Sequence, residues 1–305
     1  SKSRPRPGDG NSPPPFIDAT LTSYGAAGGV TGSCHLLTIE RRLILIDCGA
    51  FQGSDDAEEL NRQAFDFDPK KLDAVVLTHG HYDHVGRLPM LTKAGYKGPI
   101  YATPPTIEVT QRQLINSSKI QRSDWDQRDQ KPFTTGRREP WPPMYRERDV
   151  RDLFDQFAPL EYDRELMIGP YTSLTLHDAG HMLGSAYVEV STPRHTFIAS
   201  GDLGHREQIV VRGTQPPPLA NALALESTYG GQTHPPLEES IEKLARIIRE
   251  TVPTGNVLIP TFALERAQDL LFVLRGLLEE ERVPPISVFL DSPSAITFTE
   301  LHRRY

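Results

Sequence analysis

The chain has 305 residues, a formal net charge of −7, and a composition of 37% hydrophobic and 24% charged residues. It is long enough for one large domain or two modest ones with a real hydrophobic core, and no apolar run is long enough to span a bilayer. The negative charge argues against a protein that coats nucleic acid non-specifically.

Short strands are predicted for the first part of the chain, after a polar tail. Residues 1–15 are rich in Pro, Arg, Ser and Gly and lack the apolar stretch of a secretory signal, so we expect a disordered tail. Strands are expected at 17–23, 34–39 and 43–47, a helix near 55–64, and a buried strand at 72–77. Residues 99–102 favour another strand, and 104–122 a helix that begins with proline. Further strands are expected at 171–177, 186–190 and 196–199.

One stretch differs from the acidic remainder. Residues 112–151 hold ten Lys/Arg against six Asp/Glu, a net charge of +4, and both tryptophans, Trp125 and Trp141. Within it, residues 123–143 are polar and contain proline, which predicts an excursion over the surface. Such a segment can hold a phosphate backbone and stack bases. It can equally be a solvated surface loop, the interpretation that these residues alone favour.

The pattern changes after about residue 206. Residues 223–226, 257–260 and 287–290 have the composition of buried strands, and helical stretches lie near 237–250, 264–280 and 294–304. Strands that alternate with helices are typical of crossover units and a parallel sheet. The sequence therefore predicts a first domain over residues 16–207 and a second, α/β domain over 208–305. His302, on the last helix, is expected to be solvated.

The most informative segment is a histidine-rich loop. Three imidazoles and a carboxylate occupy six consecutive positions in Thr78-His79-Gly80-His81-Tyr82-Asp83-His84, directly after the strand expected at 72–77. A strand that ends in such a loop directs several neutral nitrogens and one oxygen at a single point. Zinc and similar borderline metals bind this donor set, and buried imidazoles and carboxylates are costly without partners. The loop therefore predicts a metal site.

Three further positions share this form, in which a strand is followed by a polar turn. Asp47 precedes Cys48-Gly49 at the end of one expected strand. His181 lies between two glycines in Gly180-His181-Met182-Leu183-Gly184-Ser185, and Asp202 follows Ser200-Gly201. Each is ordinary turn chemistry when taken alone. Together and in this order they form a distinctive series.

The series resembles the first four motifs of the metallo-β-lactamase superfamily: Asp47, then His79-x-His81-x-Asp83-His84, then His181, then Asp202. Leu225-Glu226-Ser227-Thr228-Tyr229-Gly230 looks like the opening motif of its β-CASP branch, whose members process nucleic acids. Three more segments resemble RNA-processing hydrolases of that branch, namely residues 25–33, Ile259-Pro260-Thr261-Phe262-Ala263 and Leu290-Asp291-Ser292-Pro293. The similarity extends from about residue 18 to the last residue.

The resemblance implies an α/β fold, an αββα sandwich with the metal site at one edge of its two sheets, followed by a partial β-CASP domain. It also implies two zinc ions. His79, His81 and His181 hold one ion, Asp83 and His84 belong to the other, and Asp202 bridges them. Asp47 orients the ligands and the hydroxide through hydrogen bonds.

The resemblance further implies a reaction. A hydroxide that bridges the metals cleaves an RNA phosphodiester bond, with Asp83, Asp47 and Glu226 as catalytic residues. In this family the residue matching Glu226 orients a histidine that protonates the leaving oxygen. Ser185, Thr228 and Tyr229 are candidate contacts to the substrate.

The chain departs from the family pattern at its end. The later histidines of the family, one the proton donor and one a ligand of the second zinc, have no counterpart before Tyr305. The segment that returns to finish the lactamase-like domain is also missing. We therefore expect a fragment of a longer protein; the alternative is a shortened protein with an incomplete second zinc site.

The leading hypothesis is a zinc-dependent ribonuclease in RNA processing, with single-stranded RNA threaded between the two domains. Two cysteines, Cys34 and Cys48, are too few for a disulfide framework and favour buried thiols in a reducing cytoplasm. Related enzymes are often dimers, so a homodimer is a further expectation, and no membrane partner is expected. The alternatives are a metallohydrolase of small esters, lactones or thioesters, and a non-catalytic relative that binds nucleic acid. The region after residue 206 disfavours a small-substrate enzyme, which has no evident need for a second domain.

Overall fold

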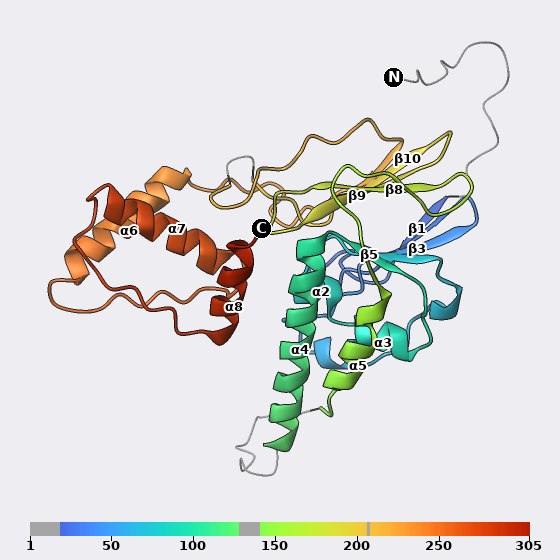
Figure 1. Cartoon of the computed structure of the whole chain (residues 1–305), viewed down its shortest axis with the longest axis horizontal. Helices are drawn as coiled ribbons and strands as arrows, with labels where there is room; N and C mark the ends of the chain where they lie inside the picture. Colours follow the sequence, from blue (N-terminus) through green and yellow to red (C-terminus); the bar gives the residue numbers. More distant parts are fainter. Residues whose placement is uncertain (1–18, 128–140, 206–207) are drawn as a thin grey trace.

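The computed structural model describes residues 19–127, 141–205 and 208–305. The tail expected at residues 1–15 and the centre of the excursion expected at 123–143 lie outside this part. In the described residues two β-sheets pack face to face, helices cover one of them, and three more helices lie to one side (Figure 1). The chain therefore shows three layers of the expected αββα sandwich: helices, sheet and sheet.

The first sheet begins antiparallel and continues parallel. It contains, in spatial order, β1 (Thr20–Ser23), β2 (His35–Ile39), β3 (Arg42–Ile46), β4 (Ala74–Val76), β5 (Ile100–Ala102) and β6 (Phe157–Pro159). The β1–β2 and β2–β3 pairs are antiparallel, whereas β3 through β6 run parallel. Strands covered on both faces have no polar face to present to water, which explains the apolar runs at residues 43–46 of β3 and 74–76 of β4.

The second sheet has the order β11-β10-β9-β8-β7. Its strands are β7 (Leu166–Met167), β8 (Ser173–Asp178), β9 (Ala186–Ser191), β10 (Thr196–Ala199) and β11 (Ala222–Ala224). All neighbouring pairs are antiparallel except β10 and β11, which are parallel. The two sheets bury one shared apolar layer that includes Leu37, Ile44, Val76, Leu174 and Val188.

Helices cover the other face of the first sheet. They are α1 (Ala57–Leu60), α2 (Tyr82–Val85), α3 (Leu88–Lys93), α4 (Pro104–Asp126) and α5 (Glu147–Asp152), with 3₁₀ turns at Pro69–Lys71 and Phe154–Gln156. Helix α4 begins as predicted with proline, and the Thr103 hydroxyl caps it by accepting the Thr106 N–H at 3.3 Å. It runs four residues beyond the predicted end at 122, so the expected excursion starts later.

The region after residue 206 forms the three predicted helices. They are α6 (Leu237–Thr251), α7 (Arg266–Glu279) and α8 (Pro293–His302). Helices α6 and α7 share an apolar cluster that includes Ala245, Ile248, Leu274 and Leu277. A second cluster joins α8 and the start of α7 to the first part of the chain through Val109, Met182, Leu264, Phe298 and Leu301.

Two of the strands expected in this region are wrong for the described structure. Residues 257–260 and 287–290 form no strand, and 223–226 contributes only β11, which joins the second sheet. A strand needs a hydrogen-bonded neighbour, and neither segment has one here. Their apolar side chains are accordingly exposed, Leu258 by 91% and Phe289 by 88%. The separate parallel sheet expected for residues 208–305 is therefore not formed within the described part.

Among the described residues, no helix combines the length and the apolar composition that crossing a bilayer requires. Both thiols are buried and free, as predicted for Cys34 and Cys48.

Gly49 shows how closely the sheet meets the histidine-rich loop. A Cβ at this position would lie 1.5 Å from the Asp83 carbonyl oxygen, whereas a Cβ at Gly276 in α7 would meet nothing within 4 Å. We expect Gly49→Ala to lower the free energy of unfolding by about 1–3 kcal/mol. The same change at Gly276 should raise it by roughly 0.5–1 kcal/mol, because alanine is the better helix former. Denaturant unfolding of both variants tests this pair; equal effects would contradict the close contact at Gly49.

Candidate metal centre

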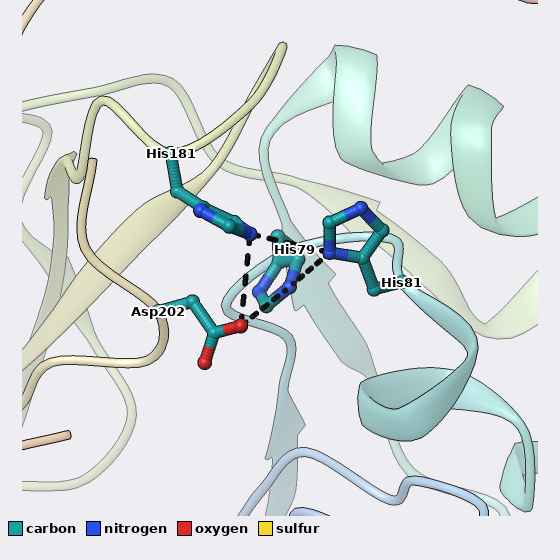
Figure 2. A group of neighbouring side chains, drawn as sticks. All are labelled: His79, His81, His181 and Asp202. Carbon is teal, nitrogen blue, oxygen red and sulfur yellow. Dashed lines mark hydrogen bonds and ion pairs between the residues drawn. The ribbon is translucent and has the colours of Figure 1, made fainter. Parts of the chain in front are cut away.

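The predicted ligands come together where strands of both sheets end. His79 and His81 follow β4, His181 follows β8, and Asp202 follows β10. Figure 2 shows the three rings and the carboxylate pointing toward one another from these separate segments. Residues far apart in the sequence thus form one group, as predicted.

The four facing atoms are close enough to hold one ion. They are Nε2 of His79, Nδ1 of His81, Nε2 of His181 and Oδ2 of Asp202, and one ligand atom from each residue lies within 4.8 Å of the others. His81 Nδ1 lies 3.0 Å from the His79 nitrogen and 3.2 Å from the His181 nitrogen. The Asp202 oxygen lies 3.7 Å from His79 and 3.6 Å from His181.

The imidazoles of this group are neutral. Burial lowers the pKa of His79 and of His181, and it lowers the pKa of His81 to about 3. A neutral His81 ring can donate its single N–H to only one of the two nitrogens beside it, so a nitrogen lone pair is left that a cation can take. Histidine nitrogens and carboxylate oxygens are among the donors that zinc takes in tetrahedral sites. The residues present therefore fit a bound metal ion.

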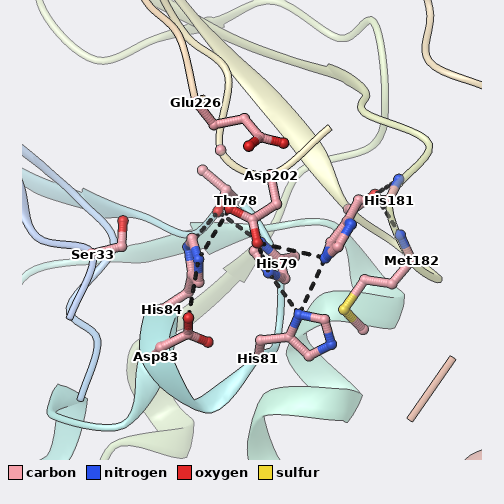
Figure 3. A network of polar contacts seen from close by, with 12 residues as sticks. Ser33, Thr78, His79, His81, Asp83, His84, His181, Met182, Asp202 and Glu226 are labelled. Carbon is pink, nitrogen blue, oxygen red and sulfur yellow. Dashed lines mark hydrogen bonds and ion pairs between the residues drawn. The ribbon is translucent and has the colours of Figure 1, made fainter. Parts of the chain in front are cut away.

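Asp83 and His84 lie beside this group, on the other side of Asp202 (Figure 3). Nε2 of His84 is 3.4 Å from Asp202 Oδ1 and 4.0 Å from Asp83 Oδ2. Asp202 therefore offers one oxygen to each side, the arrangement that a bridging ligand requires. Burial raises the pKa of Asp83. Burial also lowers the pKa of His84, but the carboxylates of Asp47 and Asp202 overcome this and raise it well above its ordinary value.

Asp47 lies behind the ligands and is 1% exposed. Its carboxylate accepts the Thr78 N–H at 2.8 Å, the Thr78 hydroxyl at 2.8 Å, the Ser33 hydroxyl at 3.0 Å and the Nδ1–H of His84 at 2.7 Å. Thr78 Oγ1 in turn lies 3.0 Å from Nδ1 of His79. Because Nδ1 of each ring has a partner, Nε2 of His79 and of His84 faces the centre.

Glu226 also acts on the centre through a neighbour. Its Oε1 accepts the N–H of Leu203, the residue after Asp202, at 3.0 Å, and its Oε2 accepts the N–H of Thr228 at 3.1 Å. The Glu226 N–H donates to the Ser200 hydroxyl at 2.9 Å. Glu226 therefore ties the end of β11 to the loop that carries Asp202.

The predicted substrate contacts divide into two kinds. Ser185 is fully buried, and its hydroxyl accepts the N–H groups of His181 and Met182 at 2.9 and 3.1 Å; its contact with substrate stays a prediction. Thr228 and Tyr229 are exposed, and the Tyr229 ring packs edge-on against His234 with centroids 4.8 Å apart. Contact of these two with substrate stays a prediction.

Sequence reasoning missed several residues around the centre. Thr78 and Ser33 are small hydroxyl residues next to predicted motifs, and a buried aspartate that needs donors is the signal that points to them. No pattern in the sequence pointed to Glu265 as a residue near the centre. The prediction that His302 is solvated is wrong, because its side chain is 6% exposed and lies 3.0 Å from the Glu265 carboxylate. This contact joins α8 to the residue before α7, and the two lie together only in the folded chain.

One cavity in the described residues is separate from this group. It has a volume of about 680 Å³ and lies between α6, α7 and residues 259–262, with Arg266, Phe262 and Leu270 among its lining residues. None of the predicted ligands lines it.

Comparison with known families agrees with the geometry. Residues 27–250 match the family described as the metallo-β-lactamase superfamily. This match covers strands β2 to β11 and all the residues of the candidate centre.

Three curated proteins are similar over most of this chain. Ribonuclease TTHA0252 of Thermus thermophilus is 40% identical over 285 residues, which are 93% of this chain and 61% of that protein. The transcription termination factor FttA of Pyrococcus abyssi is 35% identical over 83% of this chain and 39% of that protein. FttA of Methanosarcina mazei is 30% identical over 89% of this chain and 41% of that protein. The chain thus spans about two to three fifths of the length of these relatives.

The protonation states predict how metal binding and proton release are linked. The imidazoles of the first group are already neutral at pH 7, so the first equivalent of zinc should bind with little proton release. A second ion at His84 must displace the proton that Asp47 and Asp202 stabilise there, so its affinity should rise with pH and one proton should be released. Titration calorimetry in buffers of different ionisation enthalpy measures both quantities. Release of several protons by the first ion would contradict the assigned states.

Proposed function

Because the chain belongs to the metallo-β-lactamase superfamily, we propose that it forms the metal-binding part of a zinc-dependent hydrolase that cleaves RNA phosphodiester bonds. The observation that carries this proposal is the convergence of His79, His81, His181 and Asp202 in a chain 40% identical to a protein named ribonuclease. The transcription termination factors among the relatives also support a role on RNA. Both names agree with the resemblance to the β-CASP branch.

The proposed cofactor is a pair of zinc ions. His79, His81 and His181 would hold the first ion, Asp83 and His84 would contribute to the second, and Asp202 would contact both. Nitrogen-rich sites with one or two carboxylates favour zinc over magnesium or calcium. When bound, such ions neutralise phosphate charge and lower the pKa of a water toward 7, which makes hydroxide available at neutral pH.

The remaining residues orient these groups and hold protons. Asp47 fixes His84 through its Nδ1–H and fixes the histidine-rich loop through the Thr78 backbone. Asp83 is a carboxylate whose pKa burial raises, so it is suited to accept a proton at its Oδ atoms during attack on phosphorus. Glu226 keeps the Asp202 loop in place through Leu203.

RNA binding requires a local positive or aromatic surface, because the chain as a whole carries −7. Two regions can supply such a surface. The stretch 112–151 has a net charge of +4 and includes Trp141, whose exposed ring lies 5.0 Å from the Arg62 guanidinium. The exposed Tyr229 and His234 rings lie three and eight residues beyond Glu226 and offer faces on which bases of single-stranded RNA can stack.

Location and assembly are part of the same proposal. The two buried free thiols, Cys34 and Cys48, support a reducing cytoplasmic compartment. The proposal of a homodimer rests on the resemblance to the family alone.

The proposal is tested with purified full-length protein and single-stranded RNA. With zinc present, the protein should cleave the RNA, and His81→Ala should lower the rate by at least about 10³-fold, because it removes a donor to the metal that activates the nucleophile. His195→Ala, in the turn between β9 and β10, is a matched histidine deletion and should leave the rate unchanged. Equal RNA degradation by wild type and His81→Ala would defeat the proposal. Ester turnover without RNA cleavage would instead indicate a small-substrate hydrolase.

A further inference from the structure

The loop that carries His181 is bounded by two glycines. Gly180 and Gly184 both have positive backbone φ angles, +62° and +81°. Glycine reaches this region without steric cost, so the backbone can turn sharply on either side of residues 181–183. The position of the His181 ring therefore depends on the contacts that these three residues make with the rest of the molecule.

Some of those contacts come from the lactamase-like part. The Ser185 hydroxyl accepts the N–H groups of His181 and Met182, and the Gly184 carbonyl accepts the hydroxyls of Thr103 and Thr106 at 2.6 and 2.8 Å. These bonds fix the two ends of the loop. They leave the Leu183 N–H without a partner from this part.

The Leu183 N–H donates instead to Glu265, at the start of α7, over 3.1 Å to Oε2. Glu265 is 5% exposed and has a φ of +64°. A non-glycine residue in the left-handed region is strained and persists where its surroundings determine its conformation. Met182 packs in the same place against Leu264 and Phe298. The helices after residue 264 therefore contact the loop through one buried hydrogen bond and one apolar cluster.

His302 of α8 holds the Glu265 carboxylate. Its Nε2 lies 3.0 Å from Glu265 Oε2, and its Nδ1 lies 2.8 Å from the Phe298 carbonyl oxygen. Since both ring nitrogens face acceptors, the ring donates from both and carries a positive charge. Burial would lower the pKa of His302, but these two hydrogen bonds raise it. The charge-assisted bond to Glu265 is stronger than a neutral one and limits the orientations of the carboxylate.

We propose that Glu265, held by His302, is a positioning residue for the metal ligand His181. The inference rests on the proposed metal centre and extends it to the helices after residue 264. Because the same contact joins α7 and α8 to the ligand loop, docking of these helices strengthens metal binding, and metal binding strengthens docking by the same factor. The helical region is thereby linked to the chemistry of a site to which it gives no ligand.

A purely structural interface would behave differently, and the chain offers a matched control. Glu108 of α4 contacts Arg304 and Tyr305 just after α8, at 2.7 and 2.8 Å, and makes no bond to the His181 loop. Removal of Glu108 weakens the same interface without touching the loop. Glu265→Ala removes both the bond to Leu183 and the ion pair with His302, whereas Glu265→Gln keeps an acceptor for Leu183 and loses only the charge.

The experiment measures zinc affinity by competition with a chromophoric chelator, and the visible spectrum of the Co²⁺ form. Glu265→Ala should weaken binding of the first ion about 10–100-fold, as loss of an outer-shell partner does, and should alter the Co²⁺ bands. The zinc affinity of Glu265→Gln should lie between those of Glu265→Ala and wild type. Glu108→Ala should keep the wild-type affinity and spectrum even if it lowers Tm. Hydrogen exchange adds the reciprocal test: zinc should slow exchange in α8 of wild type and fail to do so in Glu265→Ala.

Unchanged zinc affinity in Glu265→Ala overturns the inference, and so does an equal loss in Glu108→Ala. If Glu265→Ala does not fold, the isosteric Glu265→Gln decides, and wild-type affinity with a wild-type spectrum then overturns it. A wild-type chain that binds no zinc or Co²⁺ is a separate outcome, which removes the proposed metal centre together with this inference.

Discussion

The buried carboxylate of Asp47 is the interaction on which the centre depends. An ionised group that is 1% exposed is stable only when its oxygens are fully hydrogen-bonded, because desolvation costs several kcal/mol per ion. Asp47 meets this requirement with donors from Ser33, Thr78 and His84. Its φ of +60° adds strain that these bonds must offset. The end of β3, the loop after β4 and the chain before β2 are therefore held together by one side chain.

This arrangement fixes the ligands before any ion binds. Thr78 orients His79, Asp47 orients His84, and Glu226 holds the loop of Asp202 through Leu203, so three of the candidate ligands are supported from the side away from the centre. The result is a group of imidazoles that are buried, neutral and close together. The single N–H of a neutral His81 ring cannot satisfy both nitrogens beside it, which leaves a lone pair for a metal ion. The sheets supply the rigidity, because every ligand segment follows a buried strand or its turn.

Patterns local in sequence predicted most of this correctly. The strand at residues 196–199 and the start of α4 match the structure, and the residues of the metal group converge as the motif order implied. The apolar runs at 257–260 and 287–290 led to wrong strand predictions, because composition cannot show whether a neighbouring strand is present to pair with them. His302 was misjudged for a related reason: its partner, the buried Glu265, is set by tertiary packing. The short elements α3, α5, β6 and β7 have too little periodicity to be recognised.

The helices after residue 264 contact the His181 loop, so the two regions of the chain meet at a candidate metal ligand. The central claim is that the three imidazoles and Asp202 are the metal ligands. Zinc K-edge X-ray absorption of the chain with one equivalent of zinc tests it most directly. The account predicts nitrogen and oxygen neighbours at about 2.0 Å with the outer-shell scattering of imidazole rings. A sulfur shell at about 2.3 Å, or an all-oxygen shell without imidazole scattering, would contradict it.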